Sequence, residues 1–160
     1  YDHLYTIDNV DDSGILTMQD SAGFARVLFD FDKYGNEQGW SFYDTNGDAA
    51  ERKPYKDMGY GYSIWMYEMD WLDREKGLSK GFQKILLDID SLPTTDNSGI
   101  HITKYEFADF DQLKSMEYMD TSKALVVNMA TGYAKLVVEY DESGNRAAVN
   151  RYDNEGNLIE

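Results

Sequence analysis

Carboxylates are the most abundant chemically active side chains in this sequence, which carries 30 Asp and Glu among 160 residues. A glycosidase needs two carboxylates about 5–10 Å apart across a cleft, but no spacing in the chain singles out such a pair. Histidine occurs only twice, as His3 and His101, and Cys is absent. Thiol catalysis and Cys-ligated zinc are therefore excluded, and no Ser–His–Asp relay or two-histidine metal site is indicated. We expect a protein that is not an enzyme.

An acidic turn provides the sharpest candidate for a metal site. Asp44, Asn46 and Asp48 place oxygen-bearing side chains at alternate positions around Gly47, as calcium-binding loops do. The segment lacks the twelve-residue frame of an EF-hand and its terminal bidentate Glu. The alternative is an ordinary Asn-Gly hairpin turn, for which the same residues are equally suited. We expect no cofactor, with calcium as the one metal that the spacing allows.

Aromatic residues provide the candidates for ligand binding. The candidates, four of which cluster between positions 62 and 71, are Trp40, Tyr62, Trp65, Tyr67 and Trp71. Strand alternation would place Trp65, Tyr67 and Trp71 on one face. Planar aromatic side chains on a β face are typical of surfaces that bind sugars or proteins. The alternative is that this face belongs to the hydrophobic core.

The net charge of −15 restricts the partners. Nucleic acid binding requires a basic surface that releases counterions, and anionic membranes also attract basic proteins. No run of about 18 apolar residues is present, so we expect no membrane insertion. A protein or a glycan is the expected partner.

Short aromatic and β-branched runs separated by Asp, Asn and Gly predict an all-β fold. Alternation over residues 24–32 predicts a strand with Val27, Phe29 and Phe31 on one face. The opposite face would carry Leu28, Asp30 and Asp32. Turns are expected at 34–36 and 44–47, with a returning strand between them.

An internal repeat organises the chain. Residues 23–51 align without gaps with residues 132–160, and the similarity extends backwards to give units 10–51 and 119–160. The identical pairs are Gly23/Gly132, Ala25/Ala134, Asp32/Asp141, Gly35/Gly144, Asn36/Asn145, Tyr43/Tyr152, Asp44/Asp153, Gly47/Gly156 and Glu51/Glu160. Stacked or paired units of this kind bury a shared face that one unit alone cannot bury.

Degenerate copies of the strand at 23–32 are expected at 61–70, 81–90 and 99–108. Each begins with Gly and a bulky residue and then carries apolar residues and an acid. The prediction is a single domain over residues 1–160. Its repeated β-hairpins would form an antiparallel meander sheet or a curled β-shell.

The segments GYAKLVVEYDESGN and RYDNEGNLIE resemble the tyrosine–aspartate (YD) repeats of bacterial surface proteins and Rhs-type proteins. The resemblance is strong over 23–51 and 132–160 and weak over 61–108. It implies that Tyr packs inside a β-layer and that Asp caps the turn, at Tyr43/Asp44, Tyr140/Asp141 and Tyr152/Asp153. Asn or Asp stands where Rhs repeats often have Arg after the turn Gly, and the chain is too short to form the cocoon of an Rhs protein.

These observations predict a non-catalytic repeat module with a structural or adhesive role, secreted or displayed on a bacterial surface. It would bind a protein or glycan partner through a sheet face or through strand edges. The alternatives are a calcium-stabilised carbohydrate-binding module and, less favoured by the residues, a glycan-active enzyme.

The two ends of the sequence suggest further pairing. Residue 1 is Tyr and no signal-peptide pattern follows, which indicates a mature product or an excised fragment. Leu158 and Ile159 are apolar where a capping unit should be polar. We therefore expect strand edges that can pair at both ends, and a homo-assembly or a place in a longer array.

Overall fold

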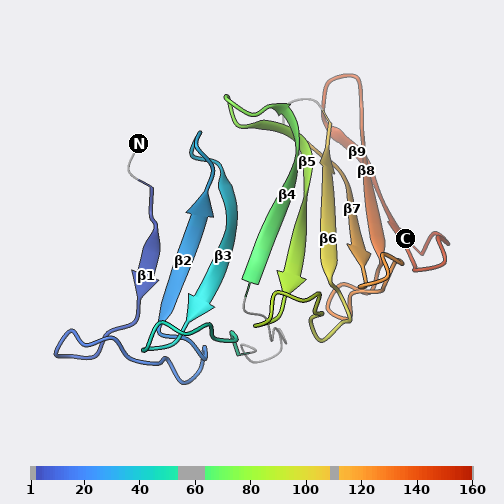
Figure 1. Ribbon diagram of the computed structural model, residues 1–160. Helices are drawn as coiled ribbons and strands as arrows, with labels where there is room; N and C mark the ends of the chain where they lie inside the picture. The colour runs from blue at the N-terminus through green and yellow to red at the C-terminus, as the bar shows by residue number, and fades with distance from the viewer. Residues whose placement is uncertain (1–2, 54–63, 109–111, 160) are drawn as a thin grey trace. The chain divides into compact units, whose positions relative to one another are not determined.

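The computed structural model describes residues 3–53, 64–108 and 112–159 (Figure 1). These residues contain no helix and form nine strands, which confirms the all-β prediction. The strands are β1 (Thr6–Asp8), β2 (Arg26–Phe31), β3 (Glu37–Tyr43), β4 (Ile64–Asp73), β5 (Leu78–Leu87), β6 (Ile102–Phe107), β7 (Leu113–Met119), β8 (Lys135–Tyr140) and β9 (Arg146–Tyr152).

The strands follow one another in the sheet in chain order, from β1 to β9, and their pairing is antiparallel. This order is that of a meander that does not close into a barrel. Three hairpins share a register shift just before the turn, between Asp30 and Phe31, between Glu106 and Phe107, and between Glu139 and Tyr140. The repeat seen in the sequence is therefore a repeat of hairpins with one bulge each.

The chain divides into two compact units, which we call unit 1 (residues 1–67 and 85–97) and unit 2 (residues 68–84 and 98–160). The core of unit 1 consists of Val27, Phe42 and Leu86. Val27 lies opposite Phe42 in the ladder, and Phe29 lies opposite Trp40. The expected apolar face of the strand at 24–32 is thus confirmed for Val27 and Phe29.

The core of unit 2 consists of Ile100, Tyr118 and Tyr133. The two Tyr rings lie 5.8 Å apart, and burial raises the pKa of Tyr118, so its hydroxyl stays protonated in the folded protein. Charged side chains lie on neighbouring positions of the same strands. Lys135 Nζ, for example, lies 2.7 Å from Glu117 Oε1.

Within the described ranges, seven turns share one hydrogen-bond pattern, and an Asp anchors each of them. One carboxylate oxygen of the Asp accepts the backbone N–H groups two and four residues later, at 2.8–3.0 Å. The backbone N–H of the same Asp donates to the carbonyl of the residue four positions later. The seven residues are Asp11, Asp32, Asp44, Asp88, Asp120, Asp141 and Asp153. These hydrogen bonds show that Asp44, Asp141 and Asp153 cap their turns, as the resemblance implies.

The residue three positions after the Asp, which is the fourth position of the turn, has a positive φ in each of these turns. Gly occupies it in five turns, at Gly14, Gly35, Gly47, Gly144 and Gly156, with φ between 80° and 87°. The other two turns place Ser91 (φ 61°) and Lys123 (φ 67°) there. A side chain in this region costs about 1–2 kcal/mol relative to Gly. These two turns therefore adopt the same backbone conformation with steric strain at Ser91 and Lys123.

The segment at 81–90 differs from its predicted place in the repeat. It was expected to match 23–32, but β5 is the returning strand of its hairpin, and the Asp88 turn follows it as the Asp44 turn follows β3. The two glycines have different roles. Gly23 has a positive φ of 79°, whereas Gly81 does not and instead faces the Tyr105 carbonyl. The expected strand at 99–108 does match, because Gly99 also has a φ of 79° and β6 follows it.

Replacing Ser91 or Lys123 by Gly should stabilise the protein. Each change removes the steric cost of a left-handed side chain, partly offset by the greater freedom of Gly in the unfolded chain. We expect a gain of about 0.5–1 kcal/mol for each variant in denaturant unfolding. Thr121→Gly, in the same turn as Lys123 but without a positive φ, serves as the control and should give no gain. Equal gains for Thr121→Gly and Lys123→Gly would contradict the strain argument.

The Asp turns should also make folding sensitive to acid. Hydrogen bonds from the Ser13 and Ser122 hydroxyls lower the pKa of Asp11 and Asp120, the backbone N–H of Asn145 lowers the pKa of Asp141, and the Asn157 amide lowers that of Asp153.

Since these folded pKa values lie below the ordinary value of about 3.9, the stabilisation is fully present above that pH and is lost as the pH falls through the folded values. The melting temperature should therefore fall below about pH 4. Asp141→Asn should lower it at neutral pH and make the acid decline less steep. Glu142→Gln, in the same turn, is the charge-matched control, and an Asp141→Asn profile parallel to the wild type would refute the argument.

Candidate functional site

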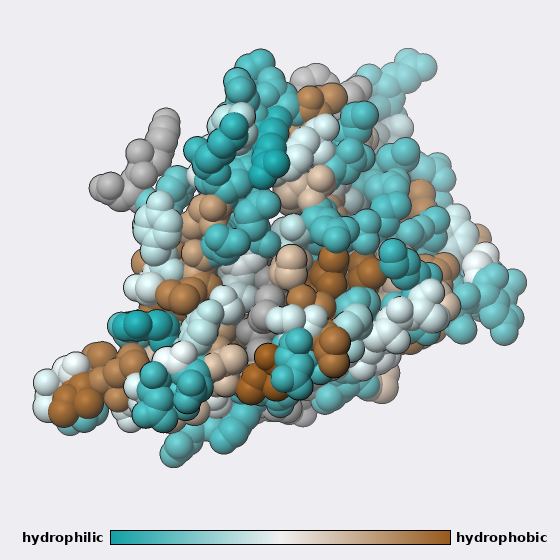
Figure 2. Space-filling view, viewed as in Figure 1, coloured by the Kyte–Doolittle hydropathy of each residue, from teal (hydrophilic) through white to brown (hydrophobic). Residues whose placement is uncertain are grey.

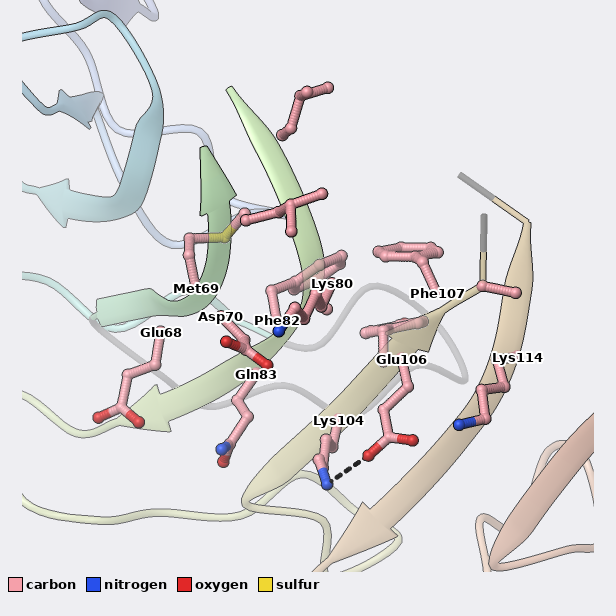
Figure 3. Close-up of a pocket in the computed structure, with 15 residues that line it drawn as sticks. Glu68, Met69, Asp70, Lys80, Phe82, Gln83, Lys104, Glu106, Phe107 and Lys114 are labelled. Atoms are coloured by element: carbon pink, nitrogen blue, oxygen red, sulfur yellow. Dashed lines mark ion pairs between the residues drawn. The ribbon is translucent and has the colours of Figure 1, made fainter. Parts of the chain in front are cut away.

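A groove of about 980 Å³ lies in unit 2, on residues of β4, β5, β6 and β7 (Figure 3). The residues that line it are Glu68, Met69, Asp70, Leu72, Leu78, Lys80, Gly81, Phe82, Gln83, Lys104, Tyr105, Glu106, Phe107, Ala108 and Lys114. Its volume is at the upper end of the range of about 300–1,000 Å³ typical of ligand pockets. It is larger than a second hollow of about 320 Å³ that residues of unit 1 line.

Three aromatic rings form one side of the groove. Phe82 of β5 stacks on Tyr105 of β6, with ring centroids 4.6 Å apart and planes inclined by 24°. The Phe107 ring lies 6.0 Å from the Phe82 ring. Figure 3 shows Phe82 and Phe107 together with Met69 in the upper part of the view. This side offers flat apolar surface of the kind that ring-shaped ligands contact.

Gly81 explains why the two strands come so close at the groove. A Cβ atom at this position would collide with the backbone carbonyl oxygen of Tyr105 and lie 3.1 Å from the Glu106 Cα. Both neighbours are backbone atoms, which cannot turn aside as a flexible side chain can. The absence of a side chain at Gly81 therefore sets the position of the adjacent Phe82 ring against Tyr105.

Charged and amide groups form the other side. Lys104 Nζ lies 2.8 Å from Glu106 Oε1, and the Ser115 hydroxyl donates to Glu106 Oε2 at 3.2 Å. In Figure 3 the polar ends of Glu68, Gln83, Lys104 and Glu106 lie below the aromatic rings. Because alternate residues of a strand point to opposite faces of the sheet, these polar side chains and the aromatic rings lie on opposite faces of the same strands.

The ion pair in the groove shifts the pKa values of both of its partners. The hydrogen bond and charge of Lys104 lower the pKa of Glu106, and Glu106 in turn raises the pKa of Lys104. A general acid at neutral pH needs a carboxyl pKa raised towards 7, which is the opposite shift. The lining contains neither His nor a hydroxyl nucleophile of Ser or Thr. Its side chains can position and hold a ligand.

Of the predicted ligand-binding aromatic residues, the structure brings together Trp40 and Trp65, which are cross-strand partners on β3 and β4. Trp40 belongs to unit 1, where its indole N–H donates to Glu37 at 2.7 Å and its ring packs edge-on against Phe29. Trp71 belongs to unit 2 and lies 5.9 Å from the Arg74 guanidinium. Neither they nor Tyr67 line the groove.

The structure does not describe the side chains of the remaining two aromatic candidates. Tyr62 lies outside the described residues, and Trp65 is described only by its backbone, which pairs with Trp40. The role of all five as ligand-binding residues stays a prediction.

The sequence analysis missed Phe82, Tyr105 and Phe107 as site residues. The segment Lys104-Tyr105-Glu106-Phe107 does alternate charged and aromatic residues, which is the one signal that could have indicated the groove. No local sequence pattern indicates that Phe82 of β5 lines the groove, because this depends on which strand lies next to β6.

The candidate calcium turn is one of the seven Asp turns. Asp44 Oδ1 accepts the backbone N–H of Asn46 at 2.8 Å and of Asp48 at 3.0 Å. The same oxygen is engaged in the same way in turns whose other side chains are not ligands for calcium. Across residues 3–53, 64–108 and 112–159 no group of three or more His, Asp or Glu is placed to hold a metal. The hydrogen bonds account for the turn without a metal, and calcium binding stays a prediction for Asp44, Asn46 and Asp48.

The described part of the chain also contains no apolar helix long enough to cross a bilayer. Comparison of the chain with protein-family models, curated proteins and solved structures finds no match.

Calcium should have little effect on stability. A ligand that binds only the folded state raises the melting temperature by mass action, but the Asp44 carboxylate already satisfies two backbone N–H groups. We expect the same melting temperature in a chelator and in millimolar calcium, measured by circular dichroism. A rise with calcium that Asp48→Asn abolishes and Asp153→Asn does not would show that the turn at 44–48 binds the metal.

Proposed function

We propose that this protein is a non-catalytic repeat module of a bacterial surface or secreted protein, with a structural or adhesive role. It contacts a protein or glycan partner through its sheet and its strand edges, and it self-associates. The tyrosine–aspartate resemblance supports the extracellular location. The observation that carries the proposal is the open edge of the sheet at β1.

The apolar face of unit 1 continues uncovered to this edge. Phe42, Val27 and Ile7 lie side by side on β3, β2 and β1. Their exposed fractions rise from 2% and 6% to 45% at Ile7. Leu4 and Tyr5 next to it are 59% and 58% exposed. A further strand paired with β1 would shield the Ile7 side chain from solvent, as β1 shields Val27 of β2.

The backbone of β1 is also prepared for a further strand. Tyr5 accepts the N–H of Phe29, and Asn9 donates to the carbonyl of Ala25, so these residues bond towards β2. In an antiparallel ladder the intervening residues, Thr6 and Asp8, direct their backbone groups to the open side. Unpaired edge groups beside exposed apolar side chains are a template for another strand.

Hydrophobic surface extends beyond the strand itself. Figure 2 shows brown surface over the loop that follows β1, at the lower left of the view. The exposed apolar residues of that loop are Val10, Ile15 and Met18. An exposed patch of this kind, continuous with an open edge, is typical of an interaction site.

The edge at β9 differs in a way that protects it. Arg151 of β9 lies opposite Leu136 in the ladder, on the face that carries the unit 2 core, and its guanidinium lies 5.9 Å from the Tyr133 ring. A charged residue on the inner face of an edge strand is a device that natural sheets use against edge pairing. On β1 the corresponding core-facing residue is Ile7, which carries no charge.

The proposed partner at the β1 edge is a second copy of the chain. Two copies can pair β1 with β1 about a twofold axis, which keeps the strands antiparallel. The net charge of −15 opposes this contact, and salt screens that repulsion. Association should therefore strengthen as the salt concentration rises.

Ile7→Lys should abolish self-association, because the new charge would be buried between the paired edges. The matched control is Ile89→Lys: Ile89 has the same exposed fraction, 45%, but lies in a turn and not on an edge strand. Sedimentation velocity over a salt series measures the outcome.

We expect a salt-dependent dimer or larger assembly for the wild type and Ile89→Lys, and a monomer for Ile7→Lys. A folded wild-type monomer at every salt concentration would refute self-association, and equal loss in the two variants would refute the role of the β1 edge.

A further inference from the structure

We infer that the β1 edge accepts an extended segment of a partner protein, in the register that β6 has on β7, with a basic residue opposite Asp8. This inference names the protein partner of the adhesive role proposed above and rests on it. The same edge serves self-association, so the segment and a second copy of the chain compete for it. The argument depends on the equivalence of β1 and β7 and on what covers β7.

β1 and β7 are equivalent strands of the internal repeat. Three residue pairs of β1 and β2 recur in the same order in β7 and β8: Thr6/Leu28 and Ser115/Val137, Ile7/Val27 and Met116/Leu136, Asp8/Arg26 and Glu117/Lys135. The backbone hydrogen bonds agree as well. The Asn9 N–H donates to the Ala25 carbonyl at 2.8 Å, and at the same place in unit 2 the Tyr118 N–H donates to Ala134 at 2.9 Å.

The outer side of β7 is covered by β6, whereas β1 is an edge of the sheet (Figure 1). β6 pairs with β7 in an antiparallel register that includes Lys104/Glu117, Tyr105/Met116 and Glu106/Ser115. Addition of an extended segment to an open sheet edge is a common mode of peptide recognition. The repeat therefore shows, in unit 2, the kind of strand that fits the open side of β1.

The residues of β1 keep the chemistry that β6 meets on β7. Thr6 corresponds to Ser115, and both carry a hydroxyl. In unit 2 this hydroxyl donates to Glu106 Oε2 at 3.2 Å, and Ser115 is 8% exposed, whereas Thr6 is an exposed residue. Ile7 corresponds to Met116, and both are apolar. A strand like β6 would thus find a hydroxyl and an apolar side chain at the expected positions of β1.

The charge of this edge selects a basic residue in the partner. Glu117 lies 2.7 Å from Lys135 of β8 and opposite Lys104 of β6, so its carboxylate stands between two cations. Asp8 has the counterpart of the first cation, because Arg26 of β2 lies 2.6 Å away. A Lys or Arg opposite Asp8 would complete the same row, since facing residues of opposite charge stabilise a strand pair and like charges destabilise it.

The residues before β6 indicate that the partner also needs an apolar residue. Ile100, four positions before Lys104, is 3% exposed and belongs to the core of unit 2 with Tyr133. The counterpart of Tyr133 in unit 1 is Phe24, which is half-buried and packs against the core of that unit. The partner segment therefore carries an apolar residue, three further residues, a basic residue and an aromatic residue, in that order.

The test uses the full chain and a synthetic peptide with the sequence of residues 99–108, blocked at both ends. Calorimetric titration measures the dissociation constant, and hydrogen exchange followed by NMR locates the peptide. We expect exchange of the Thr6 and Asp8 backbone N–H groups to slow by about tenfold or more, because both are directed to the open side of β1. The Asn9 N–H already donates to Ala25, so it is the internal control and should change little.

A second peptide, in which Lys104 and Glu106 exchange places, is the matched control because its composition and net charge are the same. It sets Glu opposite Asp8, so its dissociation constant should be about fivefold higher or more. Asp8→Asn should bring the two constants to within about twofold, whereas Asp12→Asn, an exposed turn residue outside β1, should keep their ratio. Since the exchange is made in the peptide, the comparison holds even where Asp8→Asn weakens β1.

Three results would each overturn the inference: no peptide binding at millimolar concentration, equal binding of the two peptides, or protection of other strands without Thr6 and Asp8. In any of these cases, salt-dependent self-association would still support the proposed function, with a second copy as the occupant of the edge. Peptide binding by a chain that is monomeric at every salt concentration would support the inference and overturn self-association alone.

Competition provides the last measurement. Where the chain associates, saturating peptide should dissociate the assembly in sedimentation velocity, because the peptide and the second copy need the same backbone groups of β1. An assembly that saturating peptide leaves unchanged would place the peptide elsewhere and overturn the inference.

Discussion

One aspartate carboxylate oxygen that accepts two backbone N–H groups is the interaction on which the rest of the structure depends. It closes seven turns with the same geometry, from Asp11 to Asp153. A hairpin is marginally stable alone, so a turn that fixes the chain reversal and satisfies its own polar groups lets successive strands meet in register. The cost is concentrated at the fourth turn position, where φ is positive and where Ser91 and Lys123 stand in place of Gly.

The Asp32 and Asp141 turns lead directly into the next strand, β3 and β9, whereas the other Asp turns close a single bridge beside the strand before or after them. The strands are added to the sheet in chain order, so the core is divided between the units. Each compact unit buries its own cluster, around Phe42 in unit 1 and Tyr118 in unit 2. Growth by addition also leaves two edge strands. Arg151 places a charge on the inner face at β9, while Ile7 at β1 stays apolar and exposed. The two edges therefore differ in how open they are to a further strand.

The sequence by itself determined the elements and their turns. Alternation placed Val27 and Phe29 on the buried face, and Asp, Asn and Gly located the turns at 34–36 and 44–47. These features are local, because they depend only on the strand period and on the φ that Gly permits. It placed the segment 81–90 in the wrong half of its hairpin, since Gly81 and Gly23 look alike in sequence. Only the backbone conformation separates a glycine in a turn from one that faces a carbonyl.

The tertiary structure alone decided the candidate site. Phe82 and Tyr105 are 23 positions apart in the chain, and nothing local indicates that their rings stack at 4.6 Å. Their contact depends on the pairing order of the strands and on the close approach that Gly81 allows. Conversely, the conspicuous Trp40 packs against the core of unit 1 and does not line the groove of unit 2. Local patterns fix which residues turn and which face inward, whereas contacts such as that of Phe82 with Tyr105 form between strands that are distant in the sequence.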